Sequence, residues 1–299
     1  MLKTTLATLA LASALPAAAF SQDWRDEYRV IRFGLISGEN ETDQLARREP
    51  FRQYLERELG VQVQFHTAAN YDGTIQALAA NQIEFSVLGS SGYAAAWTLT
   101  DGGVEPLVVA VDDTGSTGYF SVIFVRCDSG FDSIDDLEGK VLAFADPDST
   151  SGYNVPYYNL RQDGYDPETF FAAIPFSGSH EAGIMGLVNG QFDAAASLGY
   201  QPDYHRGHIM AEKGMIPEGS VCPIWTSPEI TNSPMTARSN LPREMIDEMR
   251  ATVLAAPEKD PEAFLAYAGE PQVGFVPVEH DRYQWVIDMR EWFRTHRRR

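Results

Sequence analysis

Three consecutive hydroxyl side chains, Ser149, Thr150 and Ser151, are the residues of this 299-residue chain best suited to bind an anion. They lie in residues 146–152 (D-P-D-S-T-S-G), between an apolar run that predicts a buried strand and a segment that can begin a helix. The first N–H groups of a helix have no internal partner, and the helix dipole adds partial positive charge there. The segment therefore predicts an oxyanion site with neutral donors, although an ordinary helix cap uses the same residue types.

Three further polar loops follow predicted strands. Residues 70–73 (N-Y-D-G) and 178–181 (G-S-H-E) each open a predicted helix, and residues 89–92 (G-S-S-G) predict a tight turn. In open α/β sheets, ligands bind at the carboxyl ends of the strands, where such loops lie. Because His180 is expected at a helix N-terminus, it should be neutral and able to donate one N–H to a ligand; the alternative is an ordinary surface residue.

An enzyme is the competing interpretation. The hydroxyls of residues 149–151, with His180 and Glu181, supply the residue types of a secreted serine hydrolase. However, the chain has no G-x-S-x-G elbow, and Glu181 is adjacent to His180, which places it poorly to orient the imidazole. His205 and His208 form an H-x-x-H pair without a clear helix or third ligand. We therefore expect a binding protein with no catalytic residue, no metal ion and no cofactor.

The N-terminus predicts export. Residues 1–21 contain Lys3, an apolar run too short to span a bilayer and a small-residue cleavage region, so we assign them to a cleavable signal peptide. Cleavage after Ala19 or after Ser21 fits equally well. The formal net charge is −19, and removal of Lys3 makes it −20, which argues against nucleic acid as a partner. An anion site in so acidic a protein must supply its own local donors.

Alternating strand and helix patterns indicate an α/β fold of two lobes. The alternation restarts at Tyr119, so we assign residues 22–118 and 228–299 to lobe 1 and residues 119–227 to lobe 2. Two strands that cross between the lobes would form the hinge. Small ligands usually bind in clefts at such interfaces.

Several local expectations bear on the site. Residues 37–43 predict a polar loop, and a helix is expected from Pro50 to Leu59. Residues 172–176 predict a strand, and residues 199–219 predict a loop. The C-terminal helices, beginning at Pro242, are expected to pack on lobe 1.

Cys127 and Cys222 are the only cysteines of the chain. An oxidising compartment permits them to pair, but two free buried thiols fit the sequence equally well, because sequence does not show proximity. The pairing therefore stays open at this point.

A set of motifs resembles one protein family. These motifs are N-Y-D-G-x-I (70–75), T-G-Y-F-S-V (117–122), D-P-D-S-T-S-G-Y (146–153), G-S-H-E-A (178–182) and G-x-x-N-G-Q-F-D-A-A (186–195). Over roughly residues 30–241 the chain is similar to the PhnD family of periplasmic phosphonate-, phosphite- and phosphate-binding proteins. The resemblance implies a two-lobe periplasmic-binding-protein fold of type II with a closing hinge. It also implies a periplasmic substrate-binding component that serves the permease–ATPase complex of an ABC importer in the inner membrane.

The resemblance further implies which residues bind the phosphonyl group. They are the three hydroxyl residues together with one imidazole and two phenols: Ser149, Thr150, Ser151, His180, Tyr71 and Tyr119. All are neutral donors, so we expect no fixed charge in the site, which would let it open for release.

The residues that select the substituent on phosphorus are harder to assign. Family members that bind 2-aminoethylphosphonate hold its ammonium with carboxylates, and the corresponding positions here are near Tyr200 and Ser233, neither of which is acidic. Glu181 and Asp203 are close in sequence and could substitute, and Ser90 is a further candidate. The expected ligand is a phosphonate or related phosphorus oxyanion, such as phosphite, an alkylphosphonate or 2-aminoethylphosphonate. Another oxyanion, such as a sulfonate, stays an alternative.

Overall fold

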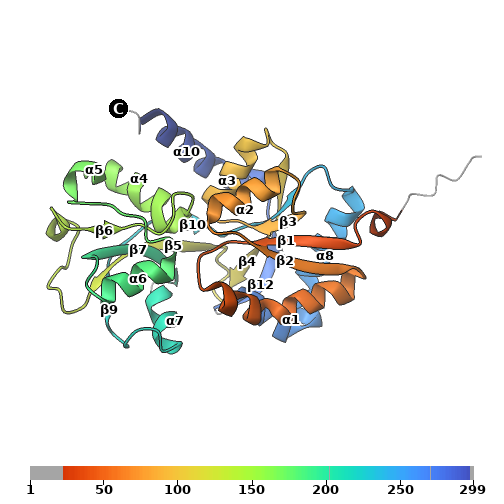
Figure 1. Cartoon of the computed structure of the whole chain (residues 1–299), viewed down its shortest axis with the longest axis horizontal. Helices are drawn as coiled ribbons and strands as arrows, with labels where there is room; N and C mark the ends of the chain where they lie inside the picture. Colours follow the sequence, from red (N-terminus) through yellow and green to blue (C-terminus); the bar gives the residue numbers. More distant parts are fainter. Residues whose placement is uncertain (1–22, 202, 270, 297–299) are drawn as a thin grey trace, which may run out of the picture.

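The computed structural model describes residues 23–201, 203–269 and 271–296. The predicted signal peptide, residues 1–21, lies outside them. Two sheets with their own helices lie side by side along the longest axis of the molecule (Figure 1). No helix in the described part of the chain is long and apolar enough to cross a membrane.

The first sheet has the strand order β12-β4-β11-β3-β1-β2. Its strands are β1 (Val30–Leu35), β2 (Gln62–Thr67), β3 (Phe85–Val87), β4 (Val104–Asp112), β11 (Met235–Arg238) and β12 (Gln272–Pro277). Strand β1 pairs in parallel with both β2 and β3, because α1 (Glu41–Leu59) and α2 (Tyr71–Ala79) serve as crossover connections. The helices α3 (Ser90–Leu99), α8 (Arg243–Lys259) and α9 (Pro261–Ala268) complete this half.

The second sheet is built on the pairing of β5 with β7. Its strands are β5 (Gly118–Arg126), β6 (Leu142–Ala143), β7 (Ala194–Gln201), β8 (Tyr204–His205), β9 (Val221–Thr226) and β10 (Ile230–Thr231). Its helices are α4 (Val155–Gln162), α5 (Pro167–Phe170), α6 (His180–Val188) and α7 (Arg206–Glu212). A single π-helical turn, Thr150–Asn154, leads into α4.

Two segments carry the chain between the sheets. One joins β4 to β5, and the other runs from β9 to β11 through β10, which pairs with β5. We propose that these segments are the hinge and that the lobes divide there, at residues 118/119 and 227/228.

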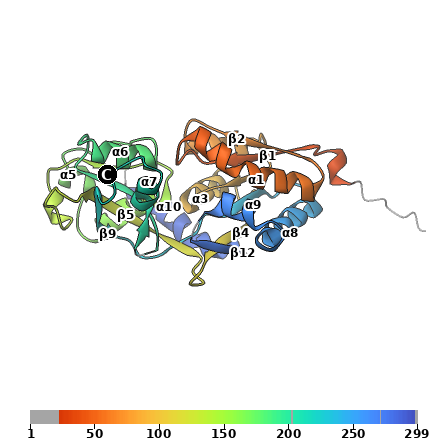
Figure 2. The same ribbon diagram turned by 90° about the horizontal axis from the view of Figure 1, so that it is seen from below.

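The last helix, α10 (Gln284–His296), departs from the expectation that all C-terminal helices pack on lobe 1. It contacts α3 beside the first sheet (Figure 2). It also buries Val286, Met289 and Phe293 in the core of the second sheet. Helix α10 therefore bridges both halves, whereas α8 and α9 pack on α1 as predicted.

Three other local predictions are wrong. Helix α1 begins at Glu41 because the Asn40 side chain caps it, and Pro50 lies inside the helix, so residues 37–43 are only partly a loop. Residues 199–219 contain the end of β7, then β8 and α7, so this region is not a loop. Residues 172–176 form two isolated bridges, to Val141 and Phe144 on either side of β6, instead of a continuous strand.

Cys127 and Cys222 form a disulfide. They lie at the ends of two paired strands, since Val125 of β5 is opposite Cys222 of β9. The bond ties the end of β5 to the start of β9, and it settles the alternative that the sequence left open.

Candidate ligand-binding site

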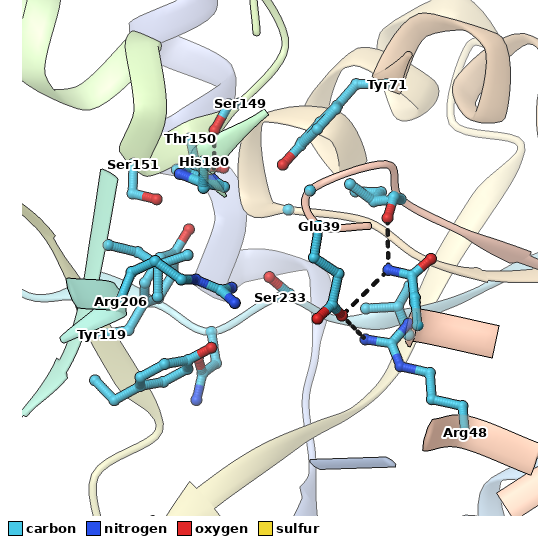
Figure 3. A pocket seen from close by; sticks show the side chains of 18 residues that line it. Glu39, Arg48, Tyr71, Tyr119, Ser149, Thr150, Ser151, His180, Arg206 and Ser233 are labelled. Carbon is cyan, nitrogen blue, oxygen red and sulfur yellow. Dashed lines mark hydrogen bonds and ion pairs between the residues drawn. The ribbon is translucent and has the colours of Figure 1, made fainter. Parts of the chain in front are cut away.

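A cavity of about 170 Å³ lies between the two sheets and is lined by all six predicted phosphonyl contacts (Figure 3). Tyr71 comes from the first sheet's half, at the start of α2, and the other five come from the second sheet and its connections. The cavity is smaller than the roughly 300–1,000 Å³ typical of sites for drug-sized molecules, so it suits a compact ligand.

The segment Ser149–Thr150–Ser151, which we call the hydroxyl segment, is held in place by hydrogen bonds. Ser149 caps the π-helical turn, with its hydroxyl accepting from the Gly152 N–H at 3.0 Å. The Ser121 hydroxyl donates to the Ser151 carbonyl at 2.7 Å. Gly152 is required here because a Cβ atom would lie 2.5 Å from Ala145 Cβ and 2.9 Å from the His180 ring. The segment therefore packs directly against the imidazole.

His180 is held from both ring nitrogens. Its Nε2 lies 3.3 Å from the Ser149 hydroxyl and its Nδ1 lies 3.1 Å from the Ser197 hydroxyl. Burial, reinforced by the positive charge of Arg206, lowers the pKa of His180 to about 3. The imidazole is therefore neutral at pH 7, as the sequence predicts, and can present one N–H to the cavity.

The two tyrosines are buried at the cavity wall and stay protonated. Burial raises the pKa of Tyr119 to about 12 and raises that of Tyr71 as well, with the Asp146 carboxylate adding to the shift at Tyr71. Tyr71 is oriented by helix α2, whose N-terminus is capped by the Asn70 side chain. Both phenols are thus available as neutral donors.

Three charged residues also line the cavity and were not predicted: Glu39, Arg48 and Arg206. The expectation of a site without fixed charge is therefore wrong. Burial alone would raise the pKa of Glu39, but attraction from Arg47, Arg48, Arg206 and Lys213 lowers it to about 2. Glu39 lies in the short loop between β1 and α1, so the strand-end argument used for the other loops could have found it.

Residues 33–283 match the family model described as ABC transporter, phosphonate, periplasmic substrate-binding protein. The chain belongs to this family. The phosphate-import protein PhnD of Mycolicibacterium smegmatis is 28% identical over 260 residues, which cover 82% of this chain and 79% of that protein. The phosphonates-binding periplasmic protein of Escherichia coli K12 is 30% identical over 231 residues, which cover 75% of this chain and 65% of that protein.

Solved structures agree with the family. A binding protein component of an ABC phosphonate transporter from Pseudomonas aeruginosa has a TM-score of 0.77 at 25% identity, covering 89% of this chain and 86% of that one. PhnD1 of Prochlorococcus marinus, in complex with methylphosphonate, has a TM-score of 0.75 at 21% identity, covering 89% and 98%. These likenesses confirm the predicted two-lobe α/β fold of periplasmic binding proteins.

For this phosphonate-binding family member, only two of the five predicted substituent-selecting residues line the cavity, Tyr200 and Ser233. The Ser90 hydroxyl donates instead to the Thr231 carbonyl at 2.5 Å, near the segment that joins the sheets. Asp203 is exposed and lies at a separate surface hollow. Glu181 is buried behind the wall, where it accepts from the Asn40 N–H at 2.9 Å. Ser90 and Glu181 lie in the first turns of α3 and α6, next to the cavity-lining residues Gly89 and His180, but their own side chains form these other contacts.

Proposed function

We propose that this protein binds a phosphonate or a related phosphorus oxyanion in the cavity and delivers it to the permease–ATPase complex of an ABC importer. One observation carries the proposal: three buried hydroxyls, a neutral imidazole and two protonated phenols converge on one small cavity. Together they offer donors to several oxygens of a tetrahedral oxyanion, which hydrogen-bonds to each more strongly than a neutral ligand would.

We further propose that the protein has no enzymatic activity and works in the periplasm after removal of residues 1–21. Ser149 lies 3.3 Å from His180 Nε2, but the other ring nitrogen is next to the Ser197 hydroxyl instead of a carboxylate. A serine nucleophile needs a base that is oriented by an acidic partner, and Glu181 does not take that position.

Isothermal titration calorimetry against phosphite, methylphosphonate, 2-aminoethylphosphonate, phosphate and taurine tests this function. We expect at least one phosphorus compound to bind below millimolar concentration and taurine to bind more weakly. If no phosphorus compound does so, the proposal fails, and tight taurine binding would favour the sulfonate alternative. Ester turnover that disappears in Ser149→Ala or Ser151→Ala would instead support the hydrolase.

Small-angle scattering tests closure, which the proposal requires because both halves contribute cavity residues. We expect a smaller radius of gyration at saturating ligand than without it. An unchanged radius would contradict closure around the ligand.

A further inference from the structure

Arg206 is a buried cation that forms no direct ion pair in the described part of the chain. Burial alone would lower its pKa, but the carboxylates of Glu39 and Glu181 attract it from beyond 4 Å and raise its pKa. Arg206 is 9% exposed, it lines the cavity, and within the described residues its Nε has no hydrogen-bond partner and its guanidinium has no ion pair within 4 Å. Figure 3 shows its guanidinium extending into the cavity from the wall opposite Glu39. A buried charge is costly unless it is paired, so this arrangement calls for an anion from outside the chain.

Among the described residues, Glu39 is the one carboxylate that lines the cavity, and it already lies within 4 Å of other cations. Arg47 forms an ion pair with Glu39, Arg48 Nη2 lies 3.9 Å from Glu39 Oε1, and Lys213 Nζ lies 3.6 Å from Glu39 Oε2. Lys213 also lies 3.6 Å from Glu181. We call these groups the Glu39 cluster: Glu39, Glu181, Arg47, Arg48, Lys213 and Arg206. Four cations face two carboxylates, which leaves an excess of two positive charges.

This excess decides which substituent fits. A ligand ammonium would have to compete for Glu39 with three cations that already lie within 4 Å of it, and it would also meet the positive charge of Arg206. An anionic group would instead pair with Arg206 and with Arg48, whose Nε also lacks a hydrogen-bond partner among the described residues. A carboxylate matches the guanidinium fork in two-pronged geometry.

We propose that Arg206 and Arg48 form a second anion subsite and that the ligand is a phosphonate whose short substituent carries a carboxylate or another anionic group. The inference rests on the proposed function, because the hydroxyl segment, His180 and the tyrosines are taken to hold the phosphonyl group. The cavity of about 170 Å³ limits the substituent to a short chain. The positions where carboxylates would hold an aminoalkyl substituent are near Tyr200 and Ser233 in this chain, and both residues line the same cavity as Arg206 and Arg48.

The test is calorimetry with three phosphonates that differ only in the end of the substituent: phosphonoacetate, ethylphosphonate and 2-aminoethylphosphonate. For the wild-type protein we expect phosphonoacetate to bind about 10–100-fold more tightly than ethylphosphonate, and 2-aminoethylphosphonate to bind no better than ethylphosphonate. Equal affinities for phosphonoacetate and ethylphosphonate would overturn the subsite, and so would a preference for 2-aminoethylphosphonate.

Substitutions then assign the preference to residues. Arg206→Gln should remove most of the preference for phosphonoacetate and change the affinity for ethylphosphonate less than about threefold. Arg206→Lys should keep part of the preference for phosphonoacetate. Arg126→Gln is the matched control, since Arg126 is the last residue of β5, does not line the cavity and forms a surface ion pair with Asp128. An equal loss for both ligands in Arg206→Gln would overturn the assignment, because Arg206 would then serve the phosphonyl group.

The outcomes separate the two proposals. If ethylphosphonate and phosphonoacetate bind equally, the proposed function stands and the second subsite fails. If no phosphonate binds but sulfoacetate does so in an Arg206-dependent way, the proposed function fails and the second subsite stands. If neither class binds, both fail. The ranking of ligands on the wild-type protein needs no variant, so it decides the matter even if Arg206→Gln does not fold.

Discussion

The backbone N–H of Ser91, at the start of α3, donates a 2.8 Å hydrogen bond to the hydroxyl oxygen of Thr150. This bond joins a helix of the first sheet to the hydroxyl segment of the second. A hydroxyl has one donor and two acceptor positions, so Thr150 can accept from Ser91 and still donate to a ligand oxygen. The central hydroxyl of the motif therefore links the two halves as well as facing the cavity.

The first prediction concerns these hydroxyls. Thr150→Val keeps the shape of the side chain and removes both hydrogen bonds, and Ser151→Ala removes one donor. Each should weaken phosphonate binding by about 1–3 kcal/mol, because a charged ligand oxygen loses its partner. Calorimetry with the phosphonate that binds most tightly measures the change. Thr169→Val, at an exposed position of α5, is the control. Unchanged affinity in both variants would remove these residues from the site.

The second prediction concerns pH. The pKa of His180 falls from the ordinary 6.5 to about 3 in the folded protein, so between these values the unfolded chain binds a proton that the folded protein does not. Stability must therefore decrease as pH drops below about 6.5. At about 1.4 kcal/mol per unit, His180 contributes a loss of about 2 kcal/mol between pH 6.5 and pH 5.

Urea unfolding at these two pH values checks this, with His180→Asn as the comparison. The wild-type protein should lose about 2 kcal/mol more than the variant on acidification. The same pH dependence in both would mean that His180 takes up a proton equally in the folded and the unfolded protein.

The neutral part of the site could be predicted because its signals are local. Ser149, Thr150, Ser151 and His180 each follow a strand and open a helical segment, which is a short-range pattern. The strand-end argument reaches Glu39 singly, but the grouping of the charged residues could not be predicted, because it depends on how distant elements meet. Glu39 and Arg206 are far apart in sequence and share a cavity only once the two sheets are placed together.

Two local features of the sequence also make the helices that carry Arg206 and Arg48 hard to predict. Helix α7 begins at Arg206 with His208 Nδ1 accepting from the His205 N–H at 3.3 Å, and histidine is not a usual capping residue. Helix α1 contains Pro50, which normally marks a helix start because it removes an N–H. Arg48 therefore lies outside the helix that the sequence predicts, although it lies within α1. The prediction of alternating strands and helices is nevertheless correct, because it depends on the spacing of apolar residues and not on the capping residues.

The third prediction concerns the disulfide. Cys127 and Cys222 are 95 residues apart, so the bond closes a long loop in the unfolded chain. By the loop-entropy relation, Cys127→Ser with Cys222→Ser should destabilise the protein by about 4–5 kcal/mol. Urea unfolding of the double variant, compared with the wild type in the presence and absence of reductant, measures this. A loss below about 1 kcal/mol would show that the bond hardly restrains the unfolded chain.

The last prediction compares two contacts through which α10 holds the hydroxyl segment. Arg290 forms a 2.9 Å ion pair with Asp148, and Phe293 packs its ring against Tyr153 and Tyr157, with centroids 5.8 Å and 5.3 Å away. The ion pair is partly exposed, so its contribution is reduced by solvent to about 0–1 kcal/mol. The buried ring contributes about 3–5 kcal/mol, since its removal leaves a cavity in the core.

Phe293→Ala should therefore destabilise the protein several times more than Arg290→Ala, as measured by urea unfolding. Leu265→Ala is the control. Leu265 lies on α9 with 48% of its side chain exposed, so the substitution removes an apolar group without leaving a cavity in the core. If Arg290→Ala cost more than Phe293→Ala, the ion pair would be the dominant tie to the segment. Because Tyr153 lies in the same π-helical turn as Thr150 and Ser151, Phe293→Ala should also weaken phosphonate binding, whereas Leu265→Ala should not.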